Sequence, residues 1–596
     1  MHYCHCGLDP QSPKKSMQND PLKYQAPNII QYPSESRWND ILRRPVADYG
    51  KLRETVGAIL EDVKGRGDKA VKEYELKFDQ VELSQLQVTK KEIAEAEKQI
   101  PEELKKAILT AKAHIEKFHA AQRTDLPRIE TAPGVVCWQK AVPIEKVGLY
   151  IPGGTAPLFS TVLMLAVPAK IAGCKEIILC SPPDKEGKIH PAILFAAKAS
   201  GVDKIFRAGG VQAIGAMAYG TESIPKVYKI FGPGNQYVTA AKQLVSLQDV
   251  AIDMPAGPSE VEVIADETAN PAFVSADLLS QAEHGVDSQA ILVTDSLDLA
   301  EKVSSEIETQ LEALPRKEIA GKALDNSRIV VLNSLDEIVA FTNRYAPEHL
   351  IIETRNYNEI AERITNAGSV FLGHYSPESA GDYASGTNHT LPTNGYARAY
   401  SGVNLDSFVK KITFQEISKE GILNIGETIQ TMAEHECLHA HKNAVALRLS
   451  PFSLIEYGSR EYRSMCRLRD EVLRKPIGLR LTEAETLRDK NDILLAGKEN
   501  GEVIACCILT KKNSDTLQLR QMAVAPSFQQ KGHGKALLCF AEKTAIENQY
   551  SIICMHARKT ATSFYEKSGY AIVGEEFTEV GIPHYEMVKR IIGLPV

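Results

Sequence analysis

The stretch that decides the fold runs from Glu260 to Asp295 and reads EVEVIADETANPAFVSADLLSQAEHGVDSQAILVTD. Its first seven residues alternate apolar and polar side chains as a strand does, and its last seven read as a second strand. Between them, Asn270 suits a helix cap, Pro271 suits the first helical position, and Gly285 supplies a stop. The pattern predicts a strand–helix–strand unit.

Three polar residues share one face of the predicted helix. Gln281 and His284 are three apart, and Asp277 lies one turn further back. They fall in the last turn, where the carbonyl end of a helix carries partial negative charge and favours a cation. The segment can therefore hold a metal ion, although a lone histidine near a helix end is more often an ordinary polar residue.

Length and composition limit what the rest of the chain can be. At 596 residues it is too long for one hydrophobic core, and its length predicts roughly three or four folding units. A net charge of −7 argues against nucleic-acid or membrane partners, and no apolar run is long enough to span a bilayer. The eleven cysteines form neither a disulfide framework nor a four-cysteine zinc pattern, which favours a reducing cytoplasm.

The amino-terminal part reads as a tail followed by helices. Residues 1–18 lack the apolar segment of a secretory signal, and we expect a disordered tail. Residues 36–122 carry charged segments with apolar positions three to four apart, which indicates helices. Their charge runs are typical of solvated helix faces, and we assign them no chemistry.

Predicted strands and helices alternate from about residue 147 to 258, as in a doubly wound parallel sheet. Glycine loops at 153–154, 209–210 and 232–234 follow strands, where nucleotide ligands usually bind. None has the GxGxxG spacing, so a dinucleotide site and ordinary turns explain them equally well. A second α/β block, 259–375, contains the opening stretch.

Residues 376–402 contain almost no aliphatic side chains and show no periodicity. A connection this long without regular structure is uncommon and is usually functional or disordered. Asp382 and His389 lie in it among glycines, threonines and tyrosines, a composition that can order around a ligand. Further on, 433–443 reads AEHECLHAHKN, a helical or turn segment whose polar residues we expect to lie at least half at the surface.

Seven motifs stand in order within the first 445 residues: GLYIPGGTAPLFSTVLMLAVPAKIAGC, IFGPGN, DMPAGPSEVEVIAD, SQAEHGVDSQ, RYAPEHL, SAGDYASGTNHTLPT and EHECLHAHKNAV. Together they resemble the histidinol dehydrogenase family. The resemblance implies oxidation of L-histidinol to L-histidine, the last step of histidine biosynthesis, by two successive hydride transfers to NAD with a bound zinc ion. It also implies an interlocked homodimer with a shared active site.

The resemblance implies roles position by position. The zinc ligands, which also contact the substrate, would be Gln281, His284, Asp382 and His441. Glu348 and His349 would be the catalytic pair. Further substrate contacts would be Ser259, His389 and Glu436, and the NAD contacts would be Tyr150, Gln212 and Asn235.

Physical reasoning supports most of these roles. Two histidines and an aspartate suit zinc, whereas a glutamine ligand rests on the resemblance alone. We expect His349 to take the alcohol proton and Glu348 to activate the water that hydrates the intermediate aldehyde. Because Gln281 and His284 end a helix, we expect them near the amino-terminal edge of the next strand, opposite the usual nucleotide crevice. The site is therefore expected between domains, with a second subunit supplying the tail residues.

After residue 449 the pattern restarts as strand, helix, hairpin and strand–helix unit, with Ser450-Pro451 as the expected hinge. Residues 529–534 read QQKGHG between a strand and a helix, a QxxGxG loop whose amides can cradle a pyrophosphate. With ATSFYEKSGY at 561–570, this loop resembles the GNAT-type N-acetyltransferases. A glycine turn before an ordinary helix is the alternative interpretation.

The second resemblance implies acetyl-CoA as cofactor. Its contacts would be Gln529, Gly532 and Gly534. Tyr565 would be the general acid for the departing thiolate. The motifs do not indicate the acceptor amine.

We therefore expect an α/β protein with two Rossmann-like layers and helical extensions, followed by a GNAT α+β domain. The expected divisions are a tail at 1–18, a dehydrogenase at 19–445 with its own tail from about 376, a linker at 446–452 and an acetyltransferase domain at 453–596. Two alternatives stay open. One is a zinc hydrolase in which Glu348 activates water on an ester or amide, and the other is a non-catalytic scaffold.

Overall fold

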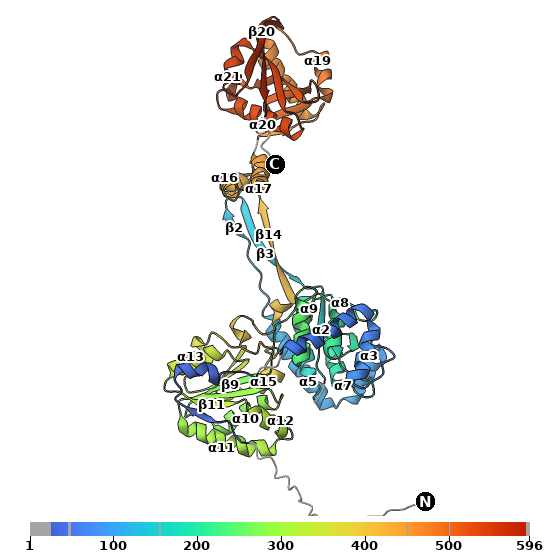
Figure 1. Cartoon of the computed structure of the whole chain (residues 1–596), viewed down its shortest axis with the longest axis vertical. Coiled ribbons are helices and arrows are strands. Elements are labelled where there is room, and N and C mark those ends of the chain that lie inside the picture. Colours follow the sequence, from blue (N-terminus) through green and yellow to red (C-terminus); the bar gives the residue numbers. More distant parts are fainter. Residues whose placement is uncertain (1–24, 46–48, 154–155, 450, 500, 592–596) are drawn as a thin grey trace, which may run out of the picture. The chain divides into compact units, whose positions relative to one another are not determined.

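The computed structural model describes residues 25–45, 49–153, 156–449, 451–499 and 501–591 (Figure 1). The predicted tail at 1–18 and Ser450 of the predicted hinge lie outside these residues. Tertiary contacts divide the chain into two units. Unit 1 comprises residues 1–127 and 138–414, and unit 2 comprises 128–137 and 415–596.

The first sheet of unit 1 is parallel, with the strand order β6-β5-β4-β7-β8. Helices link successive strands and cover both faces of the sheet, the doubly wound arrangement that the sequence predicts (Figure 1). The strands are β4 (Lys146–Tyr150), β5 (Glu176–Ser181), β6 (Lys204–Arg207), β7 (Lys229–Phe231) and β8 (Ala251–Ile252).

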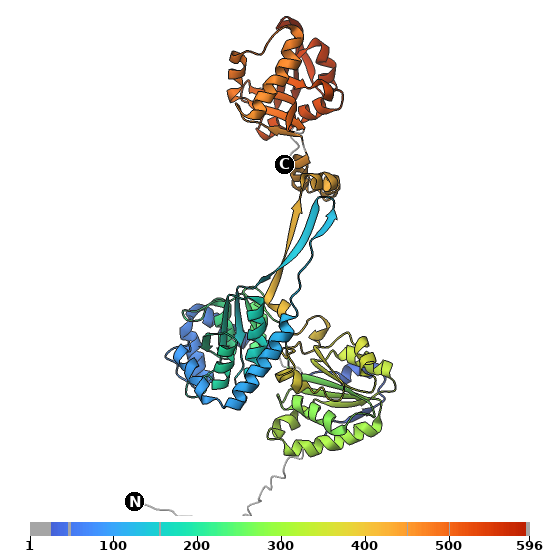
Figure 2. The same cartoon turned by 180° about the vertical axis from the view of Figure 1, so that it is seen from behind.

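Successive residues of β4 face opposite sides of this sheet. Leu149 packs with α5, α6 and α7, whereas Tyr150 packs with α2, α3, α8 and α9. The charged amino-terminal helices predicted from the sequence therefore cover both faces, as Figure 2 also shows from behind. The helices are α2 (Tyr49–Arg66), α3 (Asp68–Phe78), α4 (Lys90–Ala96), α5 (Glu102–Ala120), α6 (Phe159–Ala172), α7 (Pro191–Ala199), α8 (Gly210–Tyr219) and α9 (Gln236–Ser246).

The second sheet of unit 1 is also parallel and has the order β1-β11-β10-β9-β12-β13. The predicted strand–helix–strand unit lies at its centre as β9 (Glu260–Ala265), α10 (Pro271–Ala282) and β10 (Gln289–Thr294). Asn270 caps α10 by accepting from the backbone N–H of Ala272 at 3.0 Å. The helix ends at Ala282, so His284 lies beyond it and not in its last turn as the sequence predicted.

Strand β9 buries its polar side chains as well as its apolar ones. All six of its residues are buried, because helices cover both faces of the sheet and β9 lies between β10 and β12. Its two glutamates are accommodated by polar partners: Glu260 pairs with Arg44, and Glu262 accepts from Thr342. Besides α10, the cover consists of α1 (Trp38–Ile41), α11 (Leu297–Ala313), α12 (Lys317–Leu324), α13 (Leu335–Tyr345) and α14 (Tyr357–Arg363). The remaining strands are β1 (Ile29–Gln31), β11 (Arg328–Val331), β12 (His349–Glu353) and β13 (Ser369–Leu372).

Unit 2 begins with residues 128–137, which contain β2 (Ile129–Ala132) and the first residues of β3 (Val135–Pro143), and it continues with α16 (Lys419–His435) and α17 (His439–Leu449). Its seven-stranded sheet has the order β15-β16-β17-β18-β19-β21-β20. The predicted series of strand, helix, hairpin and strand–helix unit is confirmed there. The elements are β15 (Phe452–Leu454), α18 (Arg460–Arg469), β16 (Ile493–Glu499), β17 (Glu502–Lys511), β18 (Thr516–Val524), α20 (His533–Glu547), β19 (Ile552–Arg558), α21 (Thr562–Glu566), β20 (Ala571–Glu579) and β21 (Ile582–Arg590).

Strand β3 spans Val135–Pro143, β2 spans Ile129–Ala132 and β14 spans Val409–Ile417. The segment 376–402, predicted to lack regular structure, contains the short helix α15 (Glu378–Tyr383) and a single 3-10 turn, Tyr396–Arg398. Among the described residues, no helix combines the length and apolar character that crossing a lipid bilayer requires.

Candidate active site

Glu348 and His349 lie at the amino-terminal edge of the six-stranded sheet, where β12 begins, and both side chains are buried. The backbone N–H of Glu260 donates to Glu348 Oε2 at 2.9 Å. The carbonyl oxygen of the same residue lies 3.3 Å from His349 Nδ1, within hydrogen-bond distance. The first residue of β9 therefore fixes both side chains.

The Glu260 side chain is itself clamped. Its carboxylate accepts two hydrogen bonds from the Arg44 guanidinium, at 2.6 and 2.9 Å, and a third from the backbone N–H of Asn394 at 2.7 Å. Arg44 also donates to the carbonyl of Tyr345 at 2.7 Å. Multiple hydrogen bonds of this kind are what allow an ion pair to persist out of contact with water.

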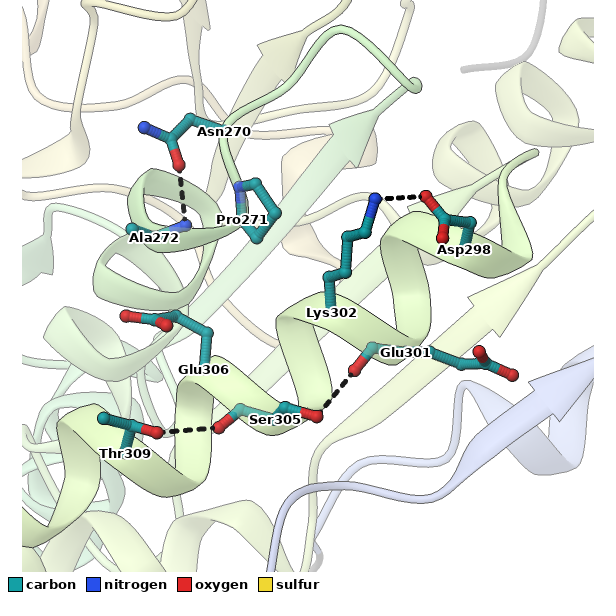
Figure 3. Close-up of a pocket in the computed structure, with 9 residues that line it drawn as sticks. All are labelled: Asn270, Pro271, Ala272, Asp298, Glu301, Lys302, Ser305, Glu306 and Thr309. Atoms are coloured by element: carbon teal, nitrogen blue, oxygen red, sulfur yellow. Dashed lines mark hydrogen bonds and ion pairs between the residues drawn. The ribbon is translucent and has the colours of Figure 1, made fainter.

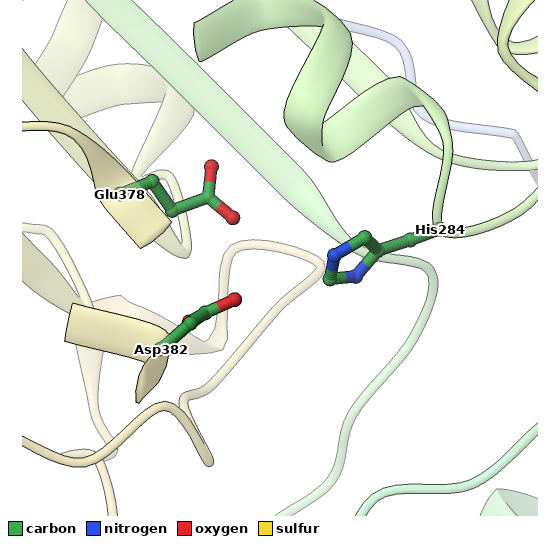
Figure 4. Close-up of side chains that lie close together, drawn as sticks. All are labelled: His284, Glu378 and Asp382. Atoms are coloured by element: carbon green, nitrogen blue, oxygen red, sulfur yellow. The ribbon is translucent and has the colours of Figure 1, made fainter. Parts of the chain in front are cut away.

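His284, Glu378 and Asp382 converge (Figure 4), and the two acids lie close to His349. One nitrogen or oxygen atom from each side chain lies within 4.8 Å of the others. Glu378 and Asp382 are four residues apart on α15, so they share one face of that helix. His284 reaches them from the turn after α10.

Several oxygens around this cluster are free to bind a cation. Gln281 is fully buried, and its Nε2 donates to Glu348 Oε2 at 3.3 Å. The atoms Gln281 Oε1, Glu378 Oε2 and Asp382 Oδ1 are buried with no hydrogen-bond partner among the described residues. Unpaired buried oxygens are costly unless a ligand or ion meets them. Nitrogen and oxygen donors of this kind suit zinc.

His349 lies among three carboxylates. Its Nδ1 is 3.7 Å from Glu348 Oε2 and 3.9 Å from Glu378 Oε1, and its Nε2 is 3.7 Å from Asp382 Oδ1. Burial disfavours the charged ring, but the three acids outweigh it and raise the pKa of His349 to about 10. Burial raises the pKa of both Glu348 and Glu378 to about 8.

Two further predicted residues adjoin this cluster. His389 directs Nδ1 at the carbonyl of Asp382 at 3.0 Å and Nε2 at Thr161 Oγ1 at 3.1 Å. Burial lowers its pKa, which favours the neutral ring. Ser259 is half-buried and directly precedes Glu260. Unit 1 therefore brings together Gln281, His284, Asp382, Ser259, His389 and the pair Glu348 and His349.

Glu436 and His441 belong to unit 2. Glu436 is the C-cap of α16, and His441 lies in the first turn of α17. Both side chains are exposed, as the sequence predicts for at least half of the polar residues in that segment.

A cavity of about 820 Å³ opens at the carboxyl-terminal edge of the five-stranded sheet. Its lining includes Tyr150, Gln212 and Asn235, the three residues that the sequence suggests for NAD, and also Gly153 and Gly210 of the glycine loops. Gly154, the other residue of the first loop, lies outside the described part of the chain. The carboxyl edge of a parallel sheet is where nucleotide ligands usually bind.

Local hydrogen bonds shape this cavity. The backbone N–H of Gly210 donates to the Tyr150 hydroxyl at 3.1 Å, and Gly210 has a φ of +52°, a conformation that favours glycine. A Cβ on Gly209 would lie 2.7 Å from Pro182 Cβ, so that position also requires glycine. Asn235 Oδ1 caps α9 by accepting from two backbone N–H groups at 3.0 and 3.1 Å.

A second hollow, of about 530 Å³, lies on the surface between the amino-terminal end of α10 and helix α11 (Figure 3). The Lys302 ammonium there pairs with Asp298 at 2.5 Å, one turn earlier on α11. The predicted site residues do not line this hollow, and its charged side chains are exposed except for that of Glu306, which is half-buried. Its side chains are typical of a solvated helix face.

In unit 2 the QxxGxG loop leads into α20. Gly532 is the N-cap with a φ of +86°, and Gln529 Nε2 donates to the carbonyl of Val524 at 2.9 Å. Strands β18 and β19 pair only from Thr516 to Leu519 on the β18 side, although β18 continues to Val524. The hydroxyl of Tyr565 lies 3.5 Å from Met522 Sδ, in the part of β18 that has separated from β19.

Sequence reasoning missed four residues of these sites. Glu378 is recognisable only once 376–402 is known to contain a helix, because its four-residue spacing from Asp382 then becomes meaningful. Arg44 and Glu260 are far apart in sequence, and no local pattern joins them. Glu75 lies in a charged helix to which we assigned no chemistry, yet its carboxylate is fully buried beside Gln212.

Comparison with known proteins confirms both resemblances. A family model described as histidinol dehydrogenase matches residues 42–449, and one described as acetyltransferase (GNAT) domain matches 473–591. Histidinol dehydrogenase from Bacteroides fragilis strain ATCC 25285 is 68% identical over 421 residues, covering 71% of this chain and 98% of that protein. The Escherichia coli K12 enzyme is 55% identical over 412 residues, covering 69% and 94%. The crystal structure of histidinol dehydrogenase from Elizabethkingia anophelis is 57% identical, with a TM-score of 0.70 and coverage of 71% and 98%. The chain therefore belongs to the histidinol dehydrogenase family, and a GNAT acetyltransferase domain follows the dehydrogenase.

Proposed function

We propose that the dehydrogenase oxidises L-histidinol to L-histidine through histidinal, using two NAD molecules in turn and one zinc ion. The observation that carries this proposal is the buried pair Glu348 and His349 beside a cluster of nitrogen and oxygen donors. A zinc ion held by Gln281, His284, Asp382 and His441 would supply a fixed positive charge that binds and orients the substrate.

The two catalytic side chains have separate tasks in this proposal. In the first oxidation His349 accepts the proton of the substrate hydroxyl while the carbinol carbon loses hydride to NAD, giving aldehyde and NADH. Glu348 then takes a proton from water, whose oxygen adds to the aldehyde carbon, while protonated His349 returns its proton to the aldehyde oxygen, which gives the hydrate and leaves His349 neutral. His349 accepts the hydroxyl proton of the resulting hydrate as the second hydride leaves.

We assign NAD to the cavity lined by Tyr150, Gln212 and Asn235. Its position at the carboxyl edge of a parallel sheet supports this, as does its size, since small-molecule sites span roughly 300–1,000 Å³. The glycine turn at Gly209 and Gly210 allows a ligand to approach the backbone closely.

We infer that Glu436 and His441 complete the site of a second subunit in a homodimer. Unit 1 supplies three of the four proposed zinc ligands, and His441 is exposed on a helix of unit 2. An imidazole from a partner would complete the proposed set of four protein ligands.

We propose that the GNAT domain binds acetyl-CoA and acetylates an amine. The left-handed Gly532 at the start of α20 and the separation of β18 from β19 support this, because loop amides at a helix start bind pyrophosphate. Gln529 and Gly534 belong to the same loop. Tyr565, beside the separated part of β18, would protonate the departing thiolate.

Replacing His284 by Asn tests the metal assignment. We expect zinc content and histidinol oxidation to fall together, because the amide lacks the imidazole donor. His556→Asn, in the GNAT domain, is the control and should retain both. Full zinc content in His284→Asn would remove His284 from the ligands. The hydrolase and scaffold alternatives predict no NADH when histidinol and NAD are supplied together.

A further inference from the structure

A buried acid from the amino-terminal helices lies beside the proposed cofactor cavity. Glu75 is on α3 and is fully buried. Its neighbour one turn later, Asp79, lines the cavity, as do Gly210 and Gln212. The proposed mechanism leaves Glu75 without a role, although burying a carboxyl group is costly unless it makes specific bonds.

One oxygen of Glu75 makes two hydrogen bonds. Its Oε1 accepts from the backbone N–H of Gly209 at 2.8 Å and from Nε2 of Gln212 at 2.8 Å. The first bond holds the glycine turn, and the second fixes which end of the Gln212 amide faces the acid. An amide group has one donor end and one acceptor end, so fixing Nε2 also fixes Oε1.

The acceptor end of this amide is the carbonyl oxygen Gln212 Oε1. Gln212 Oε1 is buried and has no hydrogen-bond partner among the described residues, although Gln212 lines the cavity. A buried carbonyl without a donor is rare in native proteins and indicates a missing partner. A ligand in the cavity that carries an N–H or O–H group would satisfy it.

The bonding does not depend on the charge of Glu75. Burial raises the pKa of Glu75 to about 8, and the nearby Asp79 adds to this rise. The hydrogen bonds from Gly209 and Gln212 act in the opposite direction. The second oxygen of Glu75, Oε2, accepts no hydrogen bond from the described part of the chain and can carry the proton, with the Asp79 carboxyl group nearby. Oε1 then remains the carbonyl oxygen and still accepts both hydrogen bonds.

We propose that Glu75 is a positioning residue for the cofactor: it orients the Gln212 amide so that Gln212 Oε1 accepts a hydrogen bond from an N–H or O–H group of NAD. The donors that NAD offers are its carboxamide, its adenine amino group and its ribose hydroxyls. The inference rests on the proposed assignment of NAD to this cavity. It adds a specificity element, since a ligand without a donor there would leave the buried carbonyl unpaired.

Three variants of Glu75, made in the full chain, test whether the effect depends on the position of its acceptor oxygen or on its charge. Glu75→Leu removes the acceptor, Glu75→Asp keeps the acid but withdraws it by one methylene, and Glu75→Gln keeps a carbonyl oxygen in place. Glu73→Leu is the matched control, because Glu73 lies on the same helix but is exposed. KM for NAD, KM for histidinol and kcat are measured for each variant, with melting temperature as a check on folding.

We expect KM for NAD to rise about tenfold in Glu75→Leu and Glu75→Asp, the effect of losing roughly one hydrogen bond. Glu75→Gln and Glu73→Leu should stay within about twofold of the wild type, since each keeps the bonds to Gly209 and Gln212. KM for histidinol and kcat at saturating NAD should be unchanged throughout. If Glu75→Leu fails to fold, the contrast between Glu75→Asp and Glu75→Gln carries the test. Equal KM values for NAD in those two variants would overturn the inference.

Gln212→Leu distinguishes this inference from the cofactor assignment. The proposal predicts that it raises KM for NAD as much as Glu75→Leu does, and that the double variant is no worse than either single variant. If Gln212→Leu raises KM for NAD but the Glu75 variants do not, the positioning role is wrong and the NAD cavity stands. If Gln212→Leu leaves KM for NAD unchanged, the cavity assignment fails and the inference fails with it.

Discussion

The backbone N–H of Glu260 donates to the carboxylate of Glu348 at 2.9 Å, so the first residue of β9 positions an acid that begins the neighbouring strand β12. The same peptide lies within hydrogen-bond distance of His349 through its carbonyl. Arg44 holds the Glu260 side chain through two hydrogen bonds. The proposed catalytic pair therefore depends, through Glu260, on an arginine that precedes it by some 300 residues.

Arg44→Met should damage both stability and turnover. It leaves the buried Glu260 carboxylate without its counter-ion, a change that typically costs about 3–5 kcal/mol. We expect a lower melting temperature and a kcat reduced at least tenfold, with KM for NAD unchanged because the proposed NAD cavity lies at the other sheet. Adding Glu260→Gln should restore part of the stability. A kcat equal to that of the wild type would show that the clamp does not position the pair.

Glu348→Gln should separate hydration from hydride transfer. The amide cannot take a proton from water, so oxidation of supplied histidinal should fall by about 10²–10⁴. Reduction of histidinal by NADH requires no hydration and should fall much less. Stopped-flow measurement of NADH in both directions makes the comparison. Equal losses in the two directions would mean that Glu348 does not activate water.

Glu262→Gln should change how stability depends on pH. Burial raises the pKa of Glu262 to about 8, whereas in the unfolded chain the group ionises near its ordinary value. Between those values the folded state holds a proton that the unfolded state has lost, so stability falls as pH rises, by up to about 1.4 kcal/mol per pH unit. The amide does not titrate and removes this contribution.

Urea unfolding at pH 5.5 and pH 7.5 measures the effect. The wild type should lose more stability than Glu262→Gln between the two pH values, because the interval lies below the folded pKa and above the unfolded one. Parallel losses in both proteins would show that Glu262 does not hold a proton in the folded state.

Gly532→Asp should weaken acetyl-CoA binding without affecting histidinol oxidation. A carboxylate at the start of α20 would repel the pyrophosphate, and we expect Kd for acetyl-CoA to rise at least about tenfold. Gly501→Asp is a matched control, since both glycines have a left-handed φ and no described heavy atom within 4 Å of an added Cβ. Calorimetric titration of the full chain measures binding. Equal Kd values for the two variants would contradict the QxxGxG assignment.

The layered fold was predictable because its determinants are local. Asn270 and Pro271 begin α10 as their residue types require, and periodicity locates β9 and β10 on either side. The burial of Glu260 and Glu262 was not predictable, because alternation indicates one exposed face. Their partners, Arg44 and Thr342, come from other parts of the chain, and no spacing in the sequence connects them.

In the candidate site, too, some features could be predicted from local sequence and others could not. His284 and Gln281 were identifiable from one helix, but the helix ends two residues before His284, and this changes the direction from which the imidazole approaches. Glu378 was missed because a six-residue helix leaves no periodic signal in a segment rich in glycine. Glu75 was missed because its helix reads as solvated, although one charged residue faces inward.

The yield of NADH per histidinol tests the central claim most directly. With limiting histidinol and excess NAD, the wild-type protein should produce two NADH per substrate, and trapping reagents should capture little free histidinal, because both oxidations occur at the site formed by Glu348 and His349. A yield of one NADH with histidinal accumulating in solution would contradict a single site that performs both steps.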